Sequence, residues 1–420
     1  MRAAKASRAG RWLVGLAAAL MVAQAALGAE FTLEVAAGAS DRAATPVCVD
    51  LDEARILATM PMDKRLPLAV LVAHGEVTAT VTGRGGAVPA QVEALGEGKA
   101  RLWWILGELA AGQKATLKAR IQRRKAPADK GFAFHDEPGK HLDLLFDGRK
   151  VTRLMYQFNP DPTQRFPTSK PFTHVFDAAG ETLITSPGGQ PYPHHRGIFI
   201  GWNRTTLPDG TRYDFWHTRN VWQRLEKFAS KATGPVFGRM VAEVRWEDPK
   251  GEAVVVEERA ITVYRQAKPE LLLDFVSTLR SQRGELKLQG DPEHAGVQFR
   301  PHPDVAKRGK ETRYVHPPGM KPGKKGTLDM PWSTLSYALG DSRFNVAHLN
   351  HPTNPQGTLY SAYRPYGRFG AYAKATLKAD EPLAVRYRIY VREGKDAALT
   401  VDEAQRLYAD YARPPVVTVK

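Results

Sequence analysis

The chain has 420 residues, a single cysteine and a formal net charge of +16 at pH 7. One thiol cannot form an internal disulfide, which excludes the small disulfide-rich scaffolds, and a chain of this length can bury a sizeable core without covalent links. The basic charge, interleaved with Trp and Tyr, favours an acidic polysaccharide over nucleic acid as a partner, although a solvated cationic surface explains the same charge.

The first residues predict export. The positively charged start consists of Arg2, Lys5, Arg8 and Arg11. An apolar run over residues 12–26 follows, too short for a comfortable membrane span, and small residues after it offer a cleavage site. We therefore expect a signal peptide over residues 1–29 and a periplasmic or secreted mature chain; an uncleaved N-terminal anchor is the alternative. No later run reaches the roughly 20 apolar residues of a membrane span.

Short alternating segments broken by Gly and Pro predict a small β-sandwich over residues 30–124. The expected strands are 31–35, 68–72, 77–81, 101–106 and 115–121. Residues 51–66 allow one or two helical turns. The charged, apolar-poor stretch 122–131 marks the domain boundary.

Longer strands follow and predict one large antiparallel β-sandwich over residues 131–413, so the fold class is all-β. The expected strands are 141–146, 151–158, 197–202, 239–246, 253–264, 270–279, 296–299, 343–349 and 383–391. Helical periodicity occurs at 402–411, which predicts a short C-terminal helix. The basic Pro- and Gly-rich stretch 301–327 is expected to be a lid over a cleft or a disordered excursion.

Two adjacent histidines lie at the start of a predicted strand. On a regular strand His194, Arg196 and Trp202 would face one side and His195 the other. Either a bulge turns one imidazole toward its neighbour, or one ring lines a site and the other supports it. Two purely structural histidines are the alternative.

The stretch 293–300 alternates between apolar and polar residues. Its polar face carries His294, Gln298 and Arg300. Three hydrogen-bonding side chains on one face suit a cleft wall, and Gly296 between them would let a ligand or another backbone approach closely. A solvent-exposed outer face explains the same alternation.

Other polar residues suit an anionic sugar. Asp214, Trp216 and His217 supply an acid, a ring platform and an imidazole. Further along are His348, His351, Arg364 and Arg368, with aromatic residues around the two arginines. Arginine binds carboxylate or sulfate with two donors at once, and aromatic rings offer apolar platforms.

Acid–base chemistry is the leading interpretation of these residues. Glu293 or Asp214 could pair with His194, His217 or His294. Binding of a metal by His194, His217, His294 or His348 with Glu293 is the competing use, but none of the spacings is a compact metal signature. Phosphate-binding loops and dinucleotide fingerprints are missing from the sequence, so we expect no nucleotide cofactor.

These segments resemble a known family. The strings at 193–202, 214–217, 292–300, 351–355 and 366–369 are similar to DUF6807, a bacterial family also labelled "methane oxygenase PmoA". The resemblance implies an exported protein of polysaccharide-degrading bacteria with a sandwich of the galactose-mutarotase type, and it brings no established catalytic residues. The oxygenase label conflicts with the sequence, because a membrane oxygenase subunit would need several spanning helices.

The sequence therefore predicts an exported carbohydrate-active enzyme, a hydrolase, lyase or epimerase, acting on an anionic or modified saccharide. The expected catalytic residues are His194, His217, Glu293 and His294. The expected substrate-binding residues are His195, Arg196, Trp202, Asp214, Trp216, Gln298, Arg300, His348, His351, Arg364 and Arg368. Non-catalytic glycan binding and a metal-dependent His/Glu site are the alternatives.

Overall fold

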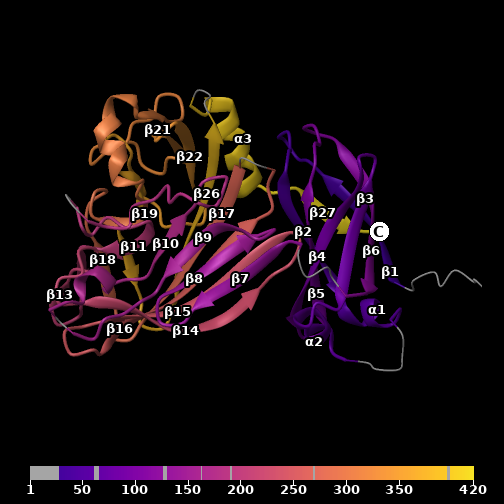
Figure 1. The fold of residues 1–420 in the computed structure, drawn as a ribbon, viewed down its shortest axis with the longest axis horizontal. Helices are drawn as coiled ribbons and strands as arrows, with labels where there is room; N and C mark the ends of the chain where they lie inside the picture. Colours follow the sequence, from indigo (N-terminus) through magenta and orange to yellow (C-terminus); the bar gives the residue numbers. More distant parts are fainter. Residues whose placement is uncertain are drawn as a thin grey trace, which may run out of the picture.

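The computed structural model describes residues 28–60, 66–125, 130–161, 163–189, 192–267, 270–394 and 398–420. It is built almost entirely of antiparallel strands and has a small N-terminal domain beside a larger one (Figure 1). The predicted all-β class is confirmed. The predicted signal peptide falls almost entirely outside the described residues, and no helix among those residues is long and apolar enough to cross a membrane.

The small domain is one seven-stranded sheet in the order β2-β5-β4-β3-β6-β1-β27, curled so that its edge strands β2 and β27 come into contact. Its strands are β1 (Gly28–Ala36), β2 (Thr45–Asp52), β3 (Val77–Gly83), β4 (Gly86–Gly96), β5 (Lys99–Leu106), β6 (Lys114–Arg123) and β27 (Val416–Val419). Two short helices, α1 (Glu53–Leu57) and α2 (Leu68–Ala73), add Ile56, Leu68 and Leu71 to its core.

The large domain contains two eight-stranded sheets. The first is ordered β23-β24-β19-β11-β10-β9-β8-β7. Its strands are β7 (Phe132–Glu137), β8 (His141–Phe146), β9 (Arg149–Met155), β10 (Phe172–Val175), β11 (Ile198–Trp202), β19 (Ala295–Phe299), β23 (Leu359–Ser361) and β24 (Phe369–Tyr372).

The second sheet is ordered β14-β15-β16-β17-β26-β22-β21-β20. Its strands are β14 (Trp222–Ala232), β15 (Phe237–Glu247), β16 (Ala253–Tyr264), β17 (Glu270–Ser281), β20 (Arg313–Val315), β21 (Trp332–Leu339), β22 (Ser342–Asn350) and β26 (Leu383–Gly394). A four-stranded sheet is made of β12 (Arg204–Thr206), β13 (Arg212–Tyr213), β18 (Leu286–Gln289) and β25 (Ala375–Leu377). Helix α3 (Val401–Ala412) follows β26, near the place where it was predicted.

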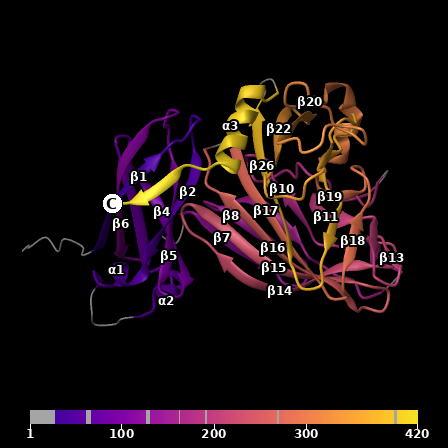
Figure 2. The same cartoon turned by 180° about the vertical axis from the view of Figure 1, so that it is seen from behind.

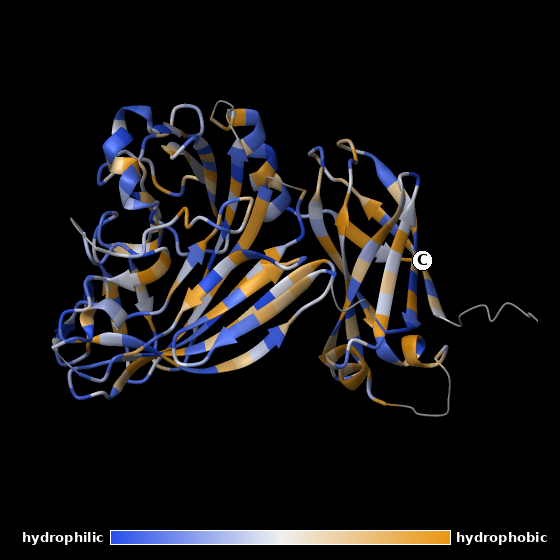
Figure 3. Cartoon of the chain, viewed as in Figure 1, coloured by the Kyte–Doolittle hydropathy of each residue, from blue (hydrophilic) through white to orange (hydrophobic). Residues whose placement is uncertain are grey.

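The main core lies between the two large sheets. Alternate residues of β11 and β19, such as Ile198, Ile200 and Val297, point into it. Hydrophobic and hydrophilic residues alternate along the strands, as expected for sheets with one face on a core (Figure 3). The opposite face of β11 carries Phe199, which packs in a separate cluster with Trp216. That opposite face carries the candidate site.

The two domains are tied together at several points. After α3 the chain returns to the small domain as β27, which pairs with β1 (Figure 2). Buried Gln91 accepts hydrogen bonds from the backbone of Val236 and Phe237 at 3.0 and 2.9 Å. The return of the C-terminus to the first sheet was not predicted.

One predicted strand is wrong. Residues 68–72 were expected to form a β-strand, but they belong to helix α2. The short apolar run fits a buried helix as well as a buried strand by periodicity, and Pro67 at the N-cap position favours the helix because proline is well tolerated at a helix start.

Candidate functional site

The site is assembled by four loops on the outer face of the first large sheet. His194 and His195 precede β11, and Asp214 to His217 follow β13. Residues 291–294 precede β19, and residues 363–368 precede β24. β11, β19 and β24 are antiparallel neighbours, so the loops before β11 and β24 lie at one end of these short strands and residues 291–294 lie at the other end. Residues 214–217 pass over the outer face of β11, where the backbone of Phe215 and Trp216 lies against Gly201, so the four segments converge across this face.

The central feature of the site is a row of four imidazoles. The ring centroids of His195 and His194 are 4.5 Å apart, those of His194 and His217 are 4.7 Å apart, and those of His217 and His294 are 5.3 Å apart. Alternation of side chains along a strand does not separate His194 from His195, because β11 begins only at Ile198 and both histidines lie in the preceding turn. Three sequence-distant segments therefore bring their imidazoles into contact.

Two of these imidazoles are held by aspartates. Nδ1 of His217 lies 2.8 Å from Oδ2 of Asp214, and Nδ1 of His294 lies 3.1 Å from Oδ1 of Asp291. A carboxylate only accepts, so Nδ1 carries the proton and Nε2 of the neutral ring is left as an acceptor. Each aspartate also accepts a backbone N–H of its own turn, Trp216 N at 3.1 Å and Glu293 N at 2.9 Å.

The hydrogen bonds to histidine also set the charge of the aspartates. Burial alone would raise the pKa of Asp291, but the hydrogen bonds from the His294 ring and from the backbone of Glu293 outweigh it and lower the pKa to about 2. Burial would also raise the pKa of Asp214, but its hydrogen bonds with His217 outweigh that effect and lower the pKa. Both carboxyl groups are therefore ionised at neutral pH.

A buried lysine lies beneath the row. The amine of Lys170 donates to the backbone carbonyl of Trp216 and lies 4.3 Å from the ring centroid of Phe199. Burial, together with nearby Arg196, lowers its pKa well below the ordinary value. Burial and the neighbouring His217 and Lys170 also lower the pKa of His194 to about 2. His194 is therefore a neutral imidazole at neutral pH.

Glu293 is bound on all sides by donors. Its Oε1 accepts from the Tyr363 hydroxyl and from Arg364 at 2.9 Å, and its Oε2 lies 2.9 Å from Arg368. Burial would raise the pKa of Glu293, but these groups lower it to about 2. A carboxylate held in this way is a weak proton donor at neutral pH, which makes Glu293 a poor candidate for the general acid.

Arg300, immediately after β19, has no such partner. Its side chain is 1% exposed, and none of its guanidinium nitrogens finds a hydrogen-bond acceptor among the described residues. Its guanidinium lies 5.6 Å from the ring centroid of Trp216. Burial, reinforced by the charge of Arg368, lowers its pKa to about 9, so it remains charged at neutral pH.

Arg300 lines a small pocket next to the imidazole row. The other lining residues are Ser186, Gly189, Tyr192, His195, Pro301, Pro303, Ala306, Tyr366 and Arg368. A second, more open hollow beside Glu293 is lined by Pro322, Gly323, Lys324, Tyr363 and Arg364. The stretch 301–327 forms walls of both hollows, and it contains a 3-10 helix (Pro303–Glu311) and β20. It is not a disordered excursion.

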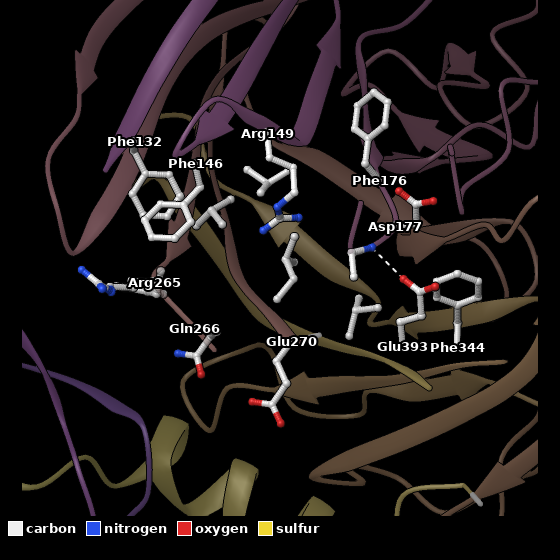
Figure 4. Close-up of a pocket in the computed structure, with 16 residues that line it drawn as sticks. Phe132, Phe146, Arg149, Phe176, Asp177, Arg265, Gln266, Glu270, Phe344 and Glu393 are labelled. Atoms are coloured by element: carbon white, nitrogen blue, oxygen red, sulfur yellow. Dashed lines mark hydrogen bonds between the residues drawn. The ribbon is translucent and has the colours of Figure 1, made fainter. Parts of the chain in front are cut away.

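A separate hollow lies elsewhere in the large domain (Figure 4). Phe132 and Phe146 stack on its wall with ring centroids 4.7 Å apart, and Glu393 accepts from the backbone of Ala178 and from Ser342. Its lining includes none of the four imidazoles. Its labelled side chains are mainly apolar or already paired, so the imidazole row is the better candidate for chemistry.

Several residues expected at the site lie elsewhere or play another part. Trp202 is in the core between the sheets and donates to Ala373 O at 3.0 Å. His348 is also fully buried, packed on Tyr360, Phe369 and Tyr387, since it faces the core from β22. These two placements correct the predictions. Strand alternation had placed Trp202 on the same face as His194, and His348 was assigned to the site by residue type alone.

Three more predicted residues sit beside or behind the site. His351 packs its ring on Tyr411 of α3, 5.0 Å away. Arg196 is 2% exposed and donates to Phe166 O and Pro193 O at 2.5 and 3.2 Å. Gln298 is fully buried and donates to Ala295 O at 3.2 Å. They support the loops, and they do not line either hollow of the site.

Two important residues, Asp291 and Lys170, are not among the predicted site residues. A signal for Asp291 was available, because Asp214 to His217 and Asp291 to His294 share the spacing Asp-x-x-His. Lys170 precedes Pro171 in a stretch without a recognisable motif, and its role depends on tertiary packing alone.

The structure offers one set of possible metal ligands. Among the described residues, ligand atoms of Asp291, Glu293 and His294 lie within 4.8 Å of one another. Two guanidinium groups already bind Glu293, and Asp291 is engaged by His294. A cation would have to displace or adjoin these positive groups, so the set fits a metal poorly.

Comparison with known proteins agrees with the resemblance seen in the sequence. No curated protein matches the chain. Residues 141–409, well over half of the chain, match the family described as "Family of unknown function (DUF6807)", and this range includes every residue of the imidazole row. The chain belongs to the DUF6807 family.

Proposed function

We propose that this protein is an exported enzyme that acts on an anionic or modified saccharide by acid–base catalysis, as a hydrolase, lyase or epimerase. The observation that supports it most is the pair of Asp–His units, Asp214–His217 and Asp291–His294, whose imidazoles lie side by side with ring centroids 5.3 Å apart. Paired carboxylate and imidazole groups of this kind orient a base and stabilise its protonated form.

In this proposal His217 and His294 are the proton-transfer groups. Each ring has Nδ1 on an aspartate, so Nε2 is free to take a proton from substrate or, once protonated, to give it to a leaving oxygen. The rings are partly open, with 20% and 30% of their side-chain surface exposed, so a substrate can reach them. Asp214 and Asp291 replace Glu293 as the carboxylate partners, because Glu293 is held by Tyr363 and two arginines.

Other features of the cleft suit a sugar. Tyr192 and Tyr366 lie with ring centroids 5.4 Å apart beside His195, and they offer apolar platforms next to polar groups. Tyr192 is 40% exposed although it is a large ring, which leaves a face for a ligand. The apolar face of a sugar ring could pack on these aromatic rings, while its hydroxyl groups form hydrogen bonds with the imidazoles, arginines and carboxylates nearby.

The experiment is turnover on a panel of neutral, uronic-acid-containing and sulfated oligosaccharides. We compare the native protein with His217→Gln and His294→Gln. His351→Gln is the matched control, because this histidine packs on Tyr411 away from the row. We expect a loss of about 10²–10⁴-fold in kcat for the first two variants and none for the control.

Equal turnover by native protein and both variants would remove the imidazoles from the chemistry. Binding of a saccharide without turnover by any form would instead identify a glycan-binding protein, in which the same aromatic and charged groups serve recognition alone.

A further inference from the structure

The pocket around Arg300 stands out because its cation is buried without a counter-ion. The other arginines that are as deeply buried each have an acceptor. Arg259 binds Glu257 at 2.7 Å, Arg388 binds Asp274 at 2.6 Å, and Arg42 binds Asp410 at 3.0 Å. Arg300 alone among this group leaves three nitrogens unpaired in the described structure. Burying an unpaired charge is costly, so a fold that keeps it has a use for it.

Neighbouring groups point to an anion as the missing partner. Nε2 of His195 is buried and also has no partner among the described residues, and its side chain lines the same pocket. Arg368, also in the lining, adds a second guanidinium that is 6% exposed. Its one carboxylate, Glu293, is shared with Arg364, so the local positive charge exceeds the negative charge.

The size of the pocket limits what can enter. Its cavity volume is about 50 Å³. By the same measure a single water needs roughly 10–15 Å³, so the enclosed part of the pocket has room for a group of a few heavy atoms. A carboxylate or a sulfate fits this limit, and both match the planar fork of donors on an arginine.

We infer that Arg300, Arg368 and His195 form a subsite for the small oxyanion of an acidic sugar, the carboxylate of a uronic acid or a sulfate ester. This inference deepens the proposed function, since it names the substrate class. The sugar ring that carries the oxyanion would lie outside the pocket, against Tyr192 and Tyr366. His195 belongs both to the subsite and to the imidazole row, because its ring contacts that of His194.

The test measures binding and does not need turnover. The probes are galacturonate, galactose 6-sulfate and neutral galactose, each titrated against the full chain by calorimetry and by thermal unfolding. We expect at least one acidic sugar to bind roughly 10–100-fold more tightly than galactose, as a charge-assisted pair predicts. The carboxylate and sulfate probes decide which oxyanion the pocket takes.

Two variants assign the effect to Arg300. Arg300→Met removes the charge but keeps the bulk, and we expect it to lose the preference for the acidic sugar while its unliganded Tm stays equal or rises, because an unpaired buried charge is gone. Arg300→Lys keeps the charge without the fork and should bind roughly tenfold more weakly. Lys99→Met on β5 is the control, since it removes one exposed positive charge in the small domain, outside both hollows of the site.

Equal affinity for acidic and neutral sugars in the native protein would overturn the inference. So would a preference that Arg300→Met and Arg300→Lys both retain. A large fall in the Tm of unliganded Arg300→Met, with the preference unchanged in Arg300→Lys, would show a structural role instead. Binding through Arg300 with no turnover on any saccharide would reject the catalytic proposal and leave this one standing.

Discussion

The imidazoles of His217 and His294 meet with ring centroids 5.3 Å apart, and each carries on Nδ1 the carboxylate of the residue three positions before it. The two units come from loops more than 70 residues apart, one after β13 and one before β19. In each, the aspartate also caps its own turn, so the backbone geometry fixes the ring. The same local arrangement occurs twice and places two oriented imidazoles next to each other.

The aspartates should therefore control catalysis through the orientation of the rings. Asp214→Asn and Asp291→Asn keep an oxygen that can cap the turn, but the amide no longer provides a carboxylate for Nδ1. We expect kcat to fall about 10²–10⁴-fold with little change in KM, measured by steady-state kinetics. Asp209→Asn is the control, because Asp209 caps a turn through Thr211 N at 2.8 Å without a histidine. Unchanged kcat in both site variants would contradict the pairing.

Glu293 should matter for stability more than for proton transfer. Glu293→Gln leaves buried Arg368 beside Arg300 without a carboxylate, so we expect the free energy of unfolding to fall by roughly 2–4 kcal/mol. Chemical denaturation measures the loss. The double variant Glu293→Gln with Arg368→Gln should recover part of it, since the uncompensated charge is removed as well. A single variant as stable as the native protein would show that solvent alone screens the charge of Arg368 adequately.

The sequence predicted the fold class well because alternation along strands reflects which face is buried. β8, β11, β16 and β19 begin or end within about two residues of the expected positions. Helix α3 was also predicted, since the apolar residues at 402–411 recur with helical periodicity; the structure adds a capping box formed by Thr400 and Glu403. The pairing of β27 with β1 could not be predicted, because the four residues of β27 have no sequence pattern that identifies a partner strand nearly 400 residues away.

The site was predicted by residue type and only partly by location. The strings around His194 and His294 flank the neighbouring strands β11 and β19, and the segment that carries His217 crosses the outer face of β11; the sequence order reveals neither relationship. Trp202 was misplaced because period-two patterning identifies two faces without saying which one is the core. His348 was misplaced because residue type alone does not reveal that its side chain is fully buried. The unpaired state of Arg300 is a tertiary property and leaves no trace in the sequence.

The buried histidines predict a fall of stability in mild acid. The pKa of His194 is lowered to about 2 and that of His174 to about 4, both chiefly by burial. The unfolded chain takes up protons on these rings below about pH 6.5 while the folded chain does not, so the free energy of unfolding decreases as the pH falls from about 7 to about 5. The lowered pKa values of Asp291 and Glu293 act in the same direction, but only below about pH 4.5.

Thermal unfolding between about pH 7.5 and about pH 5 measures this effect. We expect Tm to decrease toward acid, and the decrease to be smaller in His194→Gln by roughly 2–4 °C for each kcal/mol that the ring contributes. His135→Gln, at an exposed position on β7, should follow the native curve. A native Tm that is constant over this range would contradict the burial of neutral imidazoles.

Gly296 links the register of the sheet to the site. It lies on β19 with φ of +82°, and a Cβ there would be 1.9 Å from the carbonyl oxygen of Ala371 on β24. Gly296→Ala therefore has to separate β19 from β24, and we expect a loss of about 3 kcal/mol or more in the free energy of unfolding. Because β19 runs between His294 and Arg300, activity and anion binding should fall with it.

Gly319→Ala is the matched control for this substitution. Gly319 has nearly the same backbone angle, φ of +76°, but a Cβ there would meet no atom within 4 Å beyond its own chain neighbours. The left-handed conformation alone should cost about 1 kcal/mol there. Equal losses for the two variants, measured by chemical denaturation, would mean that backbone conformation and not the approach of β24 makes glycine necessary at position 296. A loss confined to Gly296→Ala would show that the strand contact holds the two sides of the site together.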